Sequence, residues 1–511
     1  MRNFLGSVDR VIFGGTALIY LALFVFIIGV PKTAEAVIKS TLDFTLNRLG
    51  WIYLLSFSII LIFLLFLAFS KYGRLKLGPP DSKPEYSLAS WVGMLYGAGL
   101  GVGLVFFGVN EPMSHFFYPP LADPETARAA TDAMRISFFH WGIHPWAMYT
   151  ATGLAMAYFQ HRKGLPGRIS SSFEPMLGQK GLNGNLAKII DIFAMVAILC
   201  GVATSVGFAG NQFAAGLAYQ YGFSQSTILV AVVIIIISVL STASALKGVA
   251  KGIKIVSDGN MIIVVALIAF ALIAGPTMFE FNTFFETMGN YINQLPAMSF
   301  FLDANGTVAE KAGYNWVGGW SVMYFAWWVA FAPFVGGFLS DISRGRTIRE
   351  FILACVFIPS ILCFIWFTCY GGSAISMTMG GTIPEPEQMV SNSTASLFIF
   401  LKALPIPTLS IIVAMALIIT LIVTSVNSAT YVMGVMSSGA SSSGEPSLGL
   451  RGFWGAFMAI NALLFLWVGG MQALRNSSMV GALPFMIILL LMLYNMMRSI
   501  VKEPGESAKP A

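Results

Sequence analysis

The segment WVGMLYGAGLGVGLVFFGVNEP (residues 91–112) is apolar and long enough to cross a ~30 Å hydrocarbon core as a helix, yet it is crowded with glycine. Its glycines are Gly93, Gly97, Gly99, Gly101, Gly103 and Gly108. Each of them weakens a helix by up to about 1 kcal/mol relative to alanine. A plain lipid-facing helix is therefore a poor description of this segment.

Two interpretations of these glycines are open. Small residues let membrane helices approach closely, so the glycines can serve helix packing. They can also mark a discontinuous helix, whose unwound backbone presents carbonyls to a cation and N–H groups to a carboxylate. The alternation at positions 97, 99, 101 and 103 favours the second, because it spreads glycine around the helix whereas a packing motif needs only one face.

Two aromatic clusters lie inside other apolar segments, in FHWGIHPWAMY (139–149) and MYFAWWVAFAP (323–333). Membrane helices normally carry Trp and Tyr near the interfaces instead. The clusters consist of Trp141, Trp146 and Tyr149, and of Tyr324, Phe325, Trp327, Trp328 and Phe331. Aromatic faces in a dry interior stabilise a methylated cation that has lost its water. The pattern indicates a transporter for a quaternary ammonium compound.

Composition sets the class of the protein. With 57% hydrophobic and 10% charged residues and a mean hydropathy of +0.78, the 511 residues cannot form a soluble globular protein. Apolar runs of about 20 residues predict about twelve membrane-spanning helices. The runs lie near 11–30, 51–70, 88–108, 138–160, 187–210, 226–246, 255–277, 315–340, 350–371, 408–432, 452–470 and 478–497.

Basic residues gather in alternate loops and predict the orientation. They are Lys71, Arg74, Lys76, Lys83, Arg162, Lys163, Arg168, Lys247, Lys251, Lys254, Arg344, Arg346 and Arg349. The positive-inside rule places these loops and both termini in the cytoplasm. We expect the membrane to be the plasma (inner) membrane of a bacterium. The net charge of +6 is then an orientation signal and no nucleic-acid footprint. The four cysteines form no CxxC pair, so neither a disulfide framework nor a metal site is expected.

The segment LIVTSVNSATYV (421–432) places hydroxyl and amide groups in an aliphatic helix. These groups belong to Thr424, Ser425, Asn427 and Ser428. Such groups often only bond back to their own helix or bridge to another. Taken with the glycine-rich segment, a sodium site is favoured, because dehydrated Na⁺ needs several oxygen ligands and neutral oxygens suit a monovalent ion.

The sequence resembles the betaine/choline/carnitine transporter family. The resemblance rests on GGWSVMYFAWWVAFAPFVGGFLSDISRGRTIREF (318–351), AGLGVGLVFFGVNEP (98–112), FHWGIHPWAMY and VTSVNSATYV (423–432), and covers essentially the whole chain. It implies an all-α integral membrane protein with twelve transmembrane helices, ten of them in two inverted five-helix repeats of the leucine-transporter type. It also implies a homotrimer and alternating access around a site near mid-membrane.

The resemblance implies a division of the chain. Residues 1–87 hold two N-terminal helices and a cytoplasmic loop, and 88–277 form the first repeat. An extracytoplasmic connection at 278–314 precedes the second repeat at 315–497. A short cytoplasmic tail follows at 498–511.

The resemblance also implies site residues. The aromatic box for the trimethylammonium group is Trp141, Trp146, Tyr149 and Trp328, with Trp327 and Phe331 lining the pathway below it. The sodium site takes backbone carbonyls from Gly97 and Leu100 and its other half from Leu421, Thr424 and Ser425. A second sodium site has Thr204 and Ser205 as its nearest candidates. No catalytic residue, and no cofactor or metal beyond Na⁺, is expected.

The sequence departs from known members of the family at two positions, one of which bears on sodium coupling and the other on the substrate. Sodium-independent carnitine exchangers of the family place an Arg where this chain has Asn260, so Na⁺ symport is favoured over exchange. Proton-coupled choline members tend to have an Asp where this chain has Gly103. Without that carboxylate a zwitterion suits the site better, because an unpaired buried cation is costly. Betaine, carnitine and dimethylsulfoniopropionate therefore rank above choline.

Other classes remain as alternatives: an exchanger of the same family, and a sodium-coupled amino-acid transporter of the same fold, which does not need so many central tryptophans. A membrane enzyme is disfavoured, because Glu111, Asp191 and Asp258 are expected at span ends without a grouping. His140 and His144 have the i, i+4 spacing of some zinc helices, but Pro145 and the lack of a third ligand argue against a metal. A channel is disfavoured, because the sequence has neither filter-like repeats nor rings of charged residues.

Overall fold

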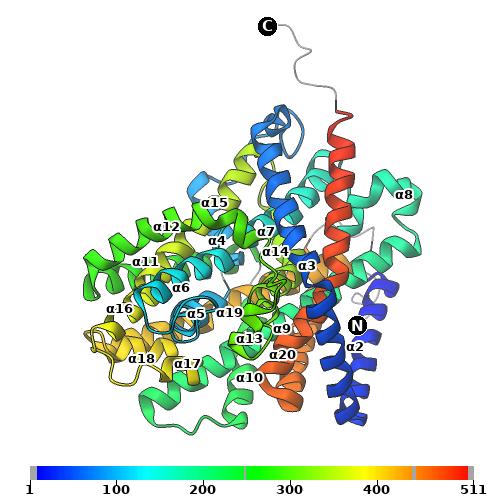
Figure 1. The fold of residues 1–511 in the computed structure, drawn as a ribbon. Helices are drawn as coiled ribbons and strands as arrows, with labels where there is room; N and C mark the ends of the chain where they lie inside the picture. Colours follow the sequence, from blue (N-terminus) through cyan, green and yellow to red (C-terminus); the bar gives the residue numbers. More distant parts are fainter. Residues whose placement is uncertain (1–7, 100, 247–248, 440–444, 504–511) are drawn as a thin grey trace.

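The computed structural model describes residues 8–99, 101–246, 249–439 and 445–503, and these are helical almost throughout (Figure 1). Strand-like pairing within the described ranges is limited to two isolated bridges, Val8 with Ser438 and Lys76 with Thr347. The first half of the chain contains α2 (Arg10–Gly29), α3 (Pro31–Phe69), η1 (Lys71–Arg74), α4 (Leu88–Gly99), α5 (Gly103–Phe117), α6 (Ala127–Trp141), α7 (Ile143–Ala157), η2 (Tyr158–Arg162), η3 (Ile169–Phe173), α8 (Glu174–Gly181), α9 (Asn185–Tyr221) and α10 (Thr227–Leu246).

The second half contains α11 (Val249–Ala274), α12 (Thr277–Ser299), α13 (Thr307–Ala312), η4 (Gly318–Val322), α14 (Met323–Asp341), α15 (Ile348–Phe367), η5 (Thr368–Gly372), α16 (Ser373–Met379), α17 (Gln388–Ser391), α18 (Ser396–Lys402), α19 (Pro407–Ser437) and α20 (Leu448–Ile500). The turns η2, η4 and η5 are π-helical and continue α7, α14 and α15. Such turns are rare and frequently occur at functional sites.

Large apolar side chains cover the outside of the molecule. Leu18, Ile228 and Ile273 are 67%, 77% and 80% exposed. A surface of this kind is unfavourable in water and is stable against lipid. Among the described residues, nine helices are long and apolar enough to cross a membrane. The chain is therefore a multi-pass, all-helical membrane protein, as the sequence predicts.

The predicted spans fall on helices, but these are not twelve unbroken ones. The run at 88–108 is divided between α4 and α5, and that at 138–160 between α6 and α7. The last two runs belong to α20, which bends at Gly469 and Gly470. Gly470 has φ 59° and ψ −147°, a conformation that is accessible essentially to glycine alone. The count of twelve and the repeat boundaries stay predictions.

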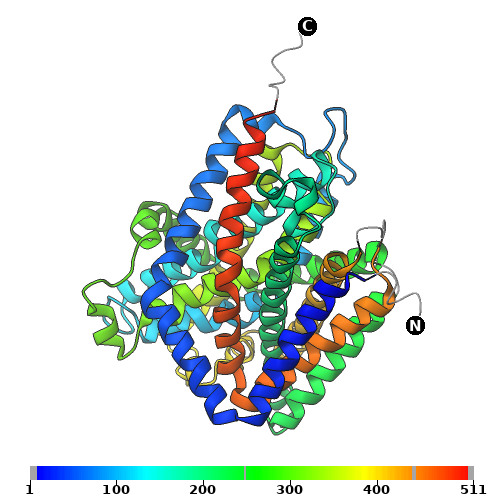
Figure 2. The same cartoon turned by 90° about the vertical axis from the view of Figure 1, so that its right-hand side faces the viewer.

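Helix α14 forms the centre of the structure, because every residue from Met323 to Ser340 is buried. It packs against α7, α9, α19 and α20. Helix α2 packs against α9, and α3 packs against α7 and α20; Figure 2 shows α3 running alongside the C-terminal half of α20. The predicted connection at 278–314 contains most of α12, which packs against α6.

Candidate functional site

The glycine-rich segment is a broken helix. Helix α4 ends at Gly99, α5 begins at Gly103, and Gly101 belongs to neither. This agrees with the discontinuous helix that the sequence predicts. Of the expected carbonyl donors to sodium, Gly97 is in the last turn of α4, whereas Leu100 lies outside the described residues.

Glycine is also required at the two helix ends for space. A Cβ atom on Gly99 would lie 2.5 Å from Cζ3 of Trp146, and one on Gly103 would lie 2.6 Å from Cη2 of Trp327. The latter would also lie 2.9 Å from Cη2 of Trp141. The close-packing interpretation therefore holds at these positions too, and what packs against the glycines is indole rings.

The aromatic residues singled out from the sequence meet beside this break. Trp328 on α14 lies at the centre of the group, with its ring centroid 5.4 Å from Trp141, 5.9 Å from Trp146 and 5.0 Å from Tyr149. Trp146 and Tyr149 are perpendicular, with centroids 5.7 Å apart. We call Trp141, Trp146, Tyr149 and Trp328 the aromatic cage. Three helices, α6, α7 and α14, supply it.

A small cavity of about 20 Å³ lies against the cage, enough for roughly one water molecule. Its lining consists of Gly99, Gly101, Gly103, Trp141, Tyr149, Ser205, Trp327, Trp328 and Phe331. Trp146 stands behind this lining and contacts Trp328. The indole N–H groups of Trp327 and Trp328 are buried without a hydrogen-bond partner among the described residues. The cavity thus combines aromatic faces with unused donors.

The predicted sodium ligands on α19 are buried next to α4 and α11. Thr424 Oγ1 donates to Leu421 O at 2.7 Å, and Ser425 Oγ donates to the same carbonyl at 3.1 Å. These are the bonds that such hydroxyls make in any helix. Thr424 Oγ1 is in addition 3.5 Å from Nδ2 of Asn260. The structure places Leu421, Thr424 and Ser425 together on α19, and their role as ligands stays a prediction.

The two candidates for a second sodium site have different surroundings. Thr204 Oγ1 donates to Leu474 O at 2.6 Å and to Cys200 O at 3.0 Å, so it ties α9 to α20 just past the bend. Ser205 borders the central cavity instead, and its hydroxyl is without a partner in the described part of the chain. Of these two candidates, only Ser205 lines the central cavity.

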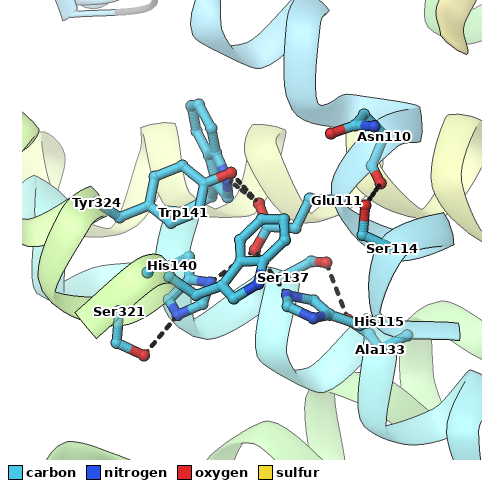
Figure 3. Close-up of polar contacts among 12 residues, drawn as sticks. Asn110, Glu111, Ser114, His115, Ala133, Ser137, His140, Trp141, Ser321 and Tyr324 are labelled. Carbon is cyan, nitrogen blue, oxygen red and sulfur yellow. Dashed lines mark hydrogen bonds and ion pairs between the residues drawn. The ribbon is translucent and has the colours of Figure 1, made fainter. Parts of the chain in front are cut away.

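Sequence reasoning missed the carboxylate behind the cage. Glu111 is not at a span end without a grouping, as expected, but is fully buried within α5. Its Oε2 accepts hydrogen bonds from Trp141 Nε1 at 2.8 Å and Tyr324 OH at 2.6 Å, and its Oε1 lies 2.6 Å from His140 Nδ1 (Figure 3). The expectation was wrong because the partners are 29 to 213 residues away. The local signals were the NEP triplet at 110–112 and the i, i+4 spacing of Glu111 and His115.

The two histidines with zinc-like spacing do not share a helix. Gly142, whose backbone is non-helical with φ −92° and ψ −140°, separates α6 from α7, and a Cβ on it would lie 2.5 Å from Phe138 O. His140 turns toward Glu111, whereas His144 Nε2 lies 3.1 Å from Ser299 Oγ. The companion of His140 is His115 on α5, whose Nε2 is 3.5 Å from Glu111 Oε1.

Ion pairs connect the end of the last helix to the basic loop at 162–163. Glu503, which follows α20, lies 2.7 Å from both Arg162 Nη2 and Lys163 Nζ, and accepts from Tyr158 OH at 3.0 Å. Burial raises the pKa of this carboxyl, but the hydrogen bonds from these three partners bring it down to about 2. Their stabilising contribution is therefore complete above the usual value of 4.5 and is lost only as the pH falls toward 2.

Comparison with known proteins gives consistent results. A family model described as "BCCT, betaine/carnitine/choline family transporter" matches residues 11–505. The chain is 42% identical over 480 residues to the glycine betaine transporter OpuD of Bacillus subtilis, covering 94% of this chain and 92% of that protein. It is 37% identical to a probable glycine betaine transporter of Desulfitobacterium hafniense (95% of each chain) and 36% identical to an ectoine/hydroxyectoine transporter of Virgibacillus pantothenticus (97% of each).

A solved structure of a Na⁺-coupled sialic acid symporter covers 87% of this chain and 86% of its own, with a TM-score of 0.48 and 13% identity. That likeness is too weak to infer a substrate or a coupling ion from.

Proposed function

Since the chain belongs to the betaine/carnitine/choline family of transporters, we propose that it imports a quaternary ammonium or sulfonium zwitterion by Na⁺ symport with alternating access. The substrate class comprises glycine betaine, carnitine and dimethylsulfoniopropionate, and the names of two relatives put glycine betaine first. We place the protein in the bacterial plasma (inner) membrane with both termini in the cytoplasm, as a homotrimer. Transport is the whole of its activity, without enzymatic chemistry.

The observation that carries this proposal is the aromatic cage set beside the start of α5. Four aromatic faces favour a trimethylammonium or dimethylsulfonium group. Helix α5 begins there without a side-chain cap, so its first N–H groups and positive dipole end suit a carboxylate. A molecule with a methylated cation at one end and a carboxylate at the other satisfies both.

The lining supports a zwitterion over choline. Among the described residues that line the cavity, none is acidic, and the indole N–H groups of Trp327 and Trp328 are available to an anion. Choline would bring a cation without a counter-charge, which is costly inside a membrane protein. Glu111 is close to the cage, but its oxygens are taken by Trp141, Tyr324 and His140.

Sodium coupling rests on the cluster of Asn260, Thr424 and Ser425 next to the broken helix. Asn260 carries no positive charge of its own with which to replace a sodium ion. Two alternatives are a sodium-independent exchanger of the same family and a sodium-coupled amino-acid transporter of the same fold. The cage of three tryptophans and a tyrosine speaks against the second, because an amino acid has no methylated cation to fill it.

The driving ion can be measured in proteoliposomes that contain the purified protein. We expect uptake of glycine betaine under an inward Na⁺ gradient, and continued uptake when a proton ionophore is added at a clamped membrane potential. Carnitine, dimethylsulfoniopropionate, choline, ectoine and leucine form the competitor panel. Abolition of uptake by the ionophore would assign the wrong driving ion, uptake without any Na⁺ would establish the exchanger, and competition by leucine alone would establish the amino-acid transporter.

The sodium site predicts the behaviour of a double variant. Thr424→Ala with Ser425→Ala removes both hydroxyls and leaves the aromatic cage intact, so the Na⁺ concentration for half-maximal uptake should rise. Any loss of apparent substrate affinity should be recovered at high Na⁺, because coupling between two ligands is reciprocal. Thr420→Ala is the matched control, because the Thr420 hydroxyl also donates to a carbonyl of its own helix, that of Ala416, and lies one turn before Thr424. An unaltered sodium dependence in the double variant would mean that the hydroxyls only bond to their own helix.

A further inference from the structure

Glu111 and two histidines form a buried cluster directly behind the aromatic cage. Glu111, His115 and His140 are each fully buried, and one ligand atom from each lies within 4.8 Å of the other two. Both ring nitrogens of His115 are without a hydrogen-bond partner among the described residues, which is a costly arrangement for a buried polar ring. We propose that Glu111, His115 and His140 form a binding site for a divalent transition-metal ion of the zinc class.

The donor set fits zinc. Two imidazoles and one carboxylate are ligands that Zn²⁺ takes in tetrahedral sites with an open fourth position, at about 2.0–2.2 Å. Ligand atoms around such an ion are then about 3.3 Å apart. His115 Nε2 and Glu111 Oε1 are 3.5 Å apart, close to that spacing. The 2.6 Å contact between His140 Nδ1 and Glu111 Oε1 has to lengthen, and the proton that it shares is released when the metal binds.

The partners of these three residues are placed as those of metal ligands are. Nε2 of His140 is 2.9 Å from Ser321 Oγ, which fixes the ring so that Nδ1 faces the cluster. The second oxygen of Glu111 is held by Trp141 and Tyr324, which leaves Oε1 for the ion (Figure 3). Metal-binding histidines and carboxylates usually carry hydrogen bonds of this kind on their far side, and these orient the ligand.

A separate cavity borders the cluster at His140. Its volume is about 130 Å³, and His140, Ser321, Trp316, Asp132 and Arg135 are among its lining residues. It lies near the start of α14, since Trp316 and Ser321 line it. The basic residues at 344–349 follow the opposite end of that helix. The cavity can also supply a water molecule as fourth ligand.

Metal binding has a consequence for the aromatic cage. The metal would join α5, which carries Glu111 and His115, to α6, which carries His140. Trp141 of the cage donates a hydrogen bond to the same Glu111 carboxylate. We expect zinc to hold these helices in one arrangement and thereby to inhibit transport. This consequence rests on the proposed function, whereas the binding site does not.

The test uses the purified full chain with its affinity tag removed. Cobalt(II), which gives visible absorption bands in tetrahedral sites, is titrated first, and zinc is then added to displace it. We expect one ion per chain. In His115→Phe, which keeps a ring between Trp316 and Trp320, the affinity should fall by at least about 100-fold, since even the loss of a ligand's hydrogen-bonding partner costs about 10- to 100-fold.

The chain contains four histidines, so His161→Asn on the opposite face is a matched control and should bind as the parent does. His115→Gln serves in case the phenylalanine variant does not fold, as judged by size-exclusion chromatography. Absence of a bound ion in the parent, or binding that survives both His115 variants, would overturn the site. Uptake measured with zinc outside, in the parent and in His115→Phe, tests inhibition separately. A chain that binds zinc but transports nothing would refute the proposed function alone.

Discussion

Replacing Trp328 by leucine is expected to lower the apparent affinity for glycine betaine by about tenfold or more. Leucine keeps apolar volume but removes the π-face, and a desolvated cation–π contact is worth up to about 2 kcal/mol. Trp328 is the most informative position because its ring contacts Trp141, Trp146 and Tyr149 at once. Uptake kinetics in proteoliposomes, with the amount of inserted protein measured alongside, provide the value.

Trp467→Leu is the matched control for this experiment, since Trp467 is 71% exposed on the outside of α20. Trp328→Phe retains an aromatic face and should recover part of the lost affinity. If Trp328→Leu and Trp141→Leu both left uptake kinetics unchanged, the aromatic cage would not be the substrate site.

The second large effect is expected at Glu111. Glu111→Gln keeps the shape of the side chain but removes the charge that accepts from Trp141 and Tyr324. Hydrogen bonds to a charged group contribute about 1.5–3 kcal/mol each, so the loss should reduce uptake at low substrate concentration by about tenfold or more. Because Glu111 acts through Trp141, we expect mainly an increased KM for the substrate, with a smaller decrease in the maximal rate.

Tyr324→Phe removes only one of these bonds and should produce a smaller change of the same kind. Glu286→Gln, at an exposed carboxylate on α12, is the control. A variant Glu111→Gln with reduced maximal rate and unaltered KM would show that Glu111 supports the fold in general and does not position the cage.

The protein class and the two aromatic clusters could be predicted from the sequence, because both depend on local properties. The choice of Trp141, Trp146, Tyr149 and Trp328 among the aromatic residues came from the resemblance to the family. Hydropathy over about 20 residues identifies a membrane span wherever it packs. The alternating glycines at 97–103 weaken a helix by their own conformational freedom, so the break between Gly99 and Gly103 needed no knowledge of neighbours. Tryptophans inside apolar segments are unusual enough to mark a site by themselves.

Tertiary structure decided which polar groups meet. From the sequence, Glu111 was expected to be an isolated carboxylate. In the structure it contacts Trp141 and His140 of α6 and Tyr324 of α14. Packing also separates neighbours along the chain: Thr204 bonds to α20, whereas Ser205 faces the cavity. A buried polar group must find its partner wherever the fold brings one, and that partner is set by long-range packing rather than by residue spacing. For this reason the two aromatic clusters were foreseeable from the sequence, whereas the meeting of Glu111 and His115 with His140 was not.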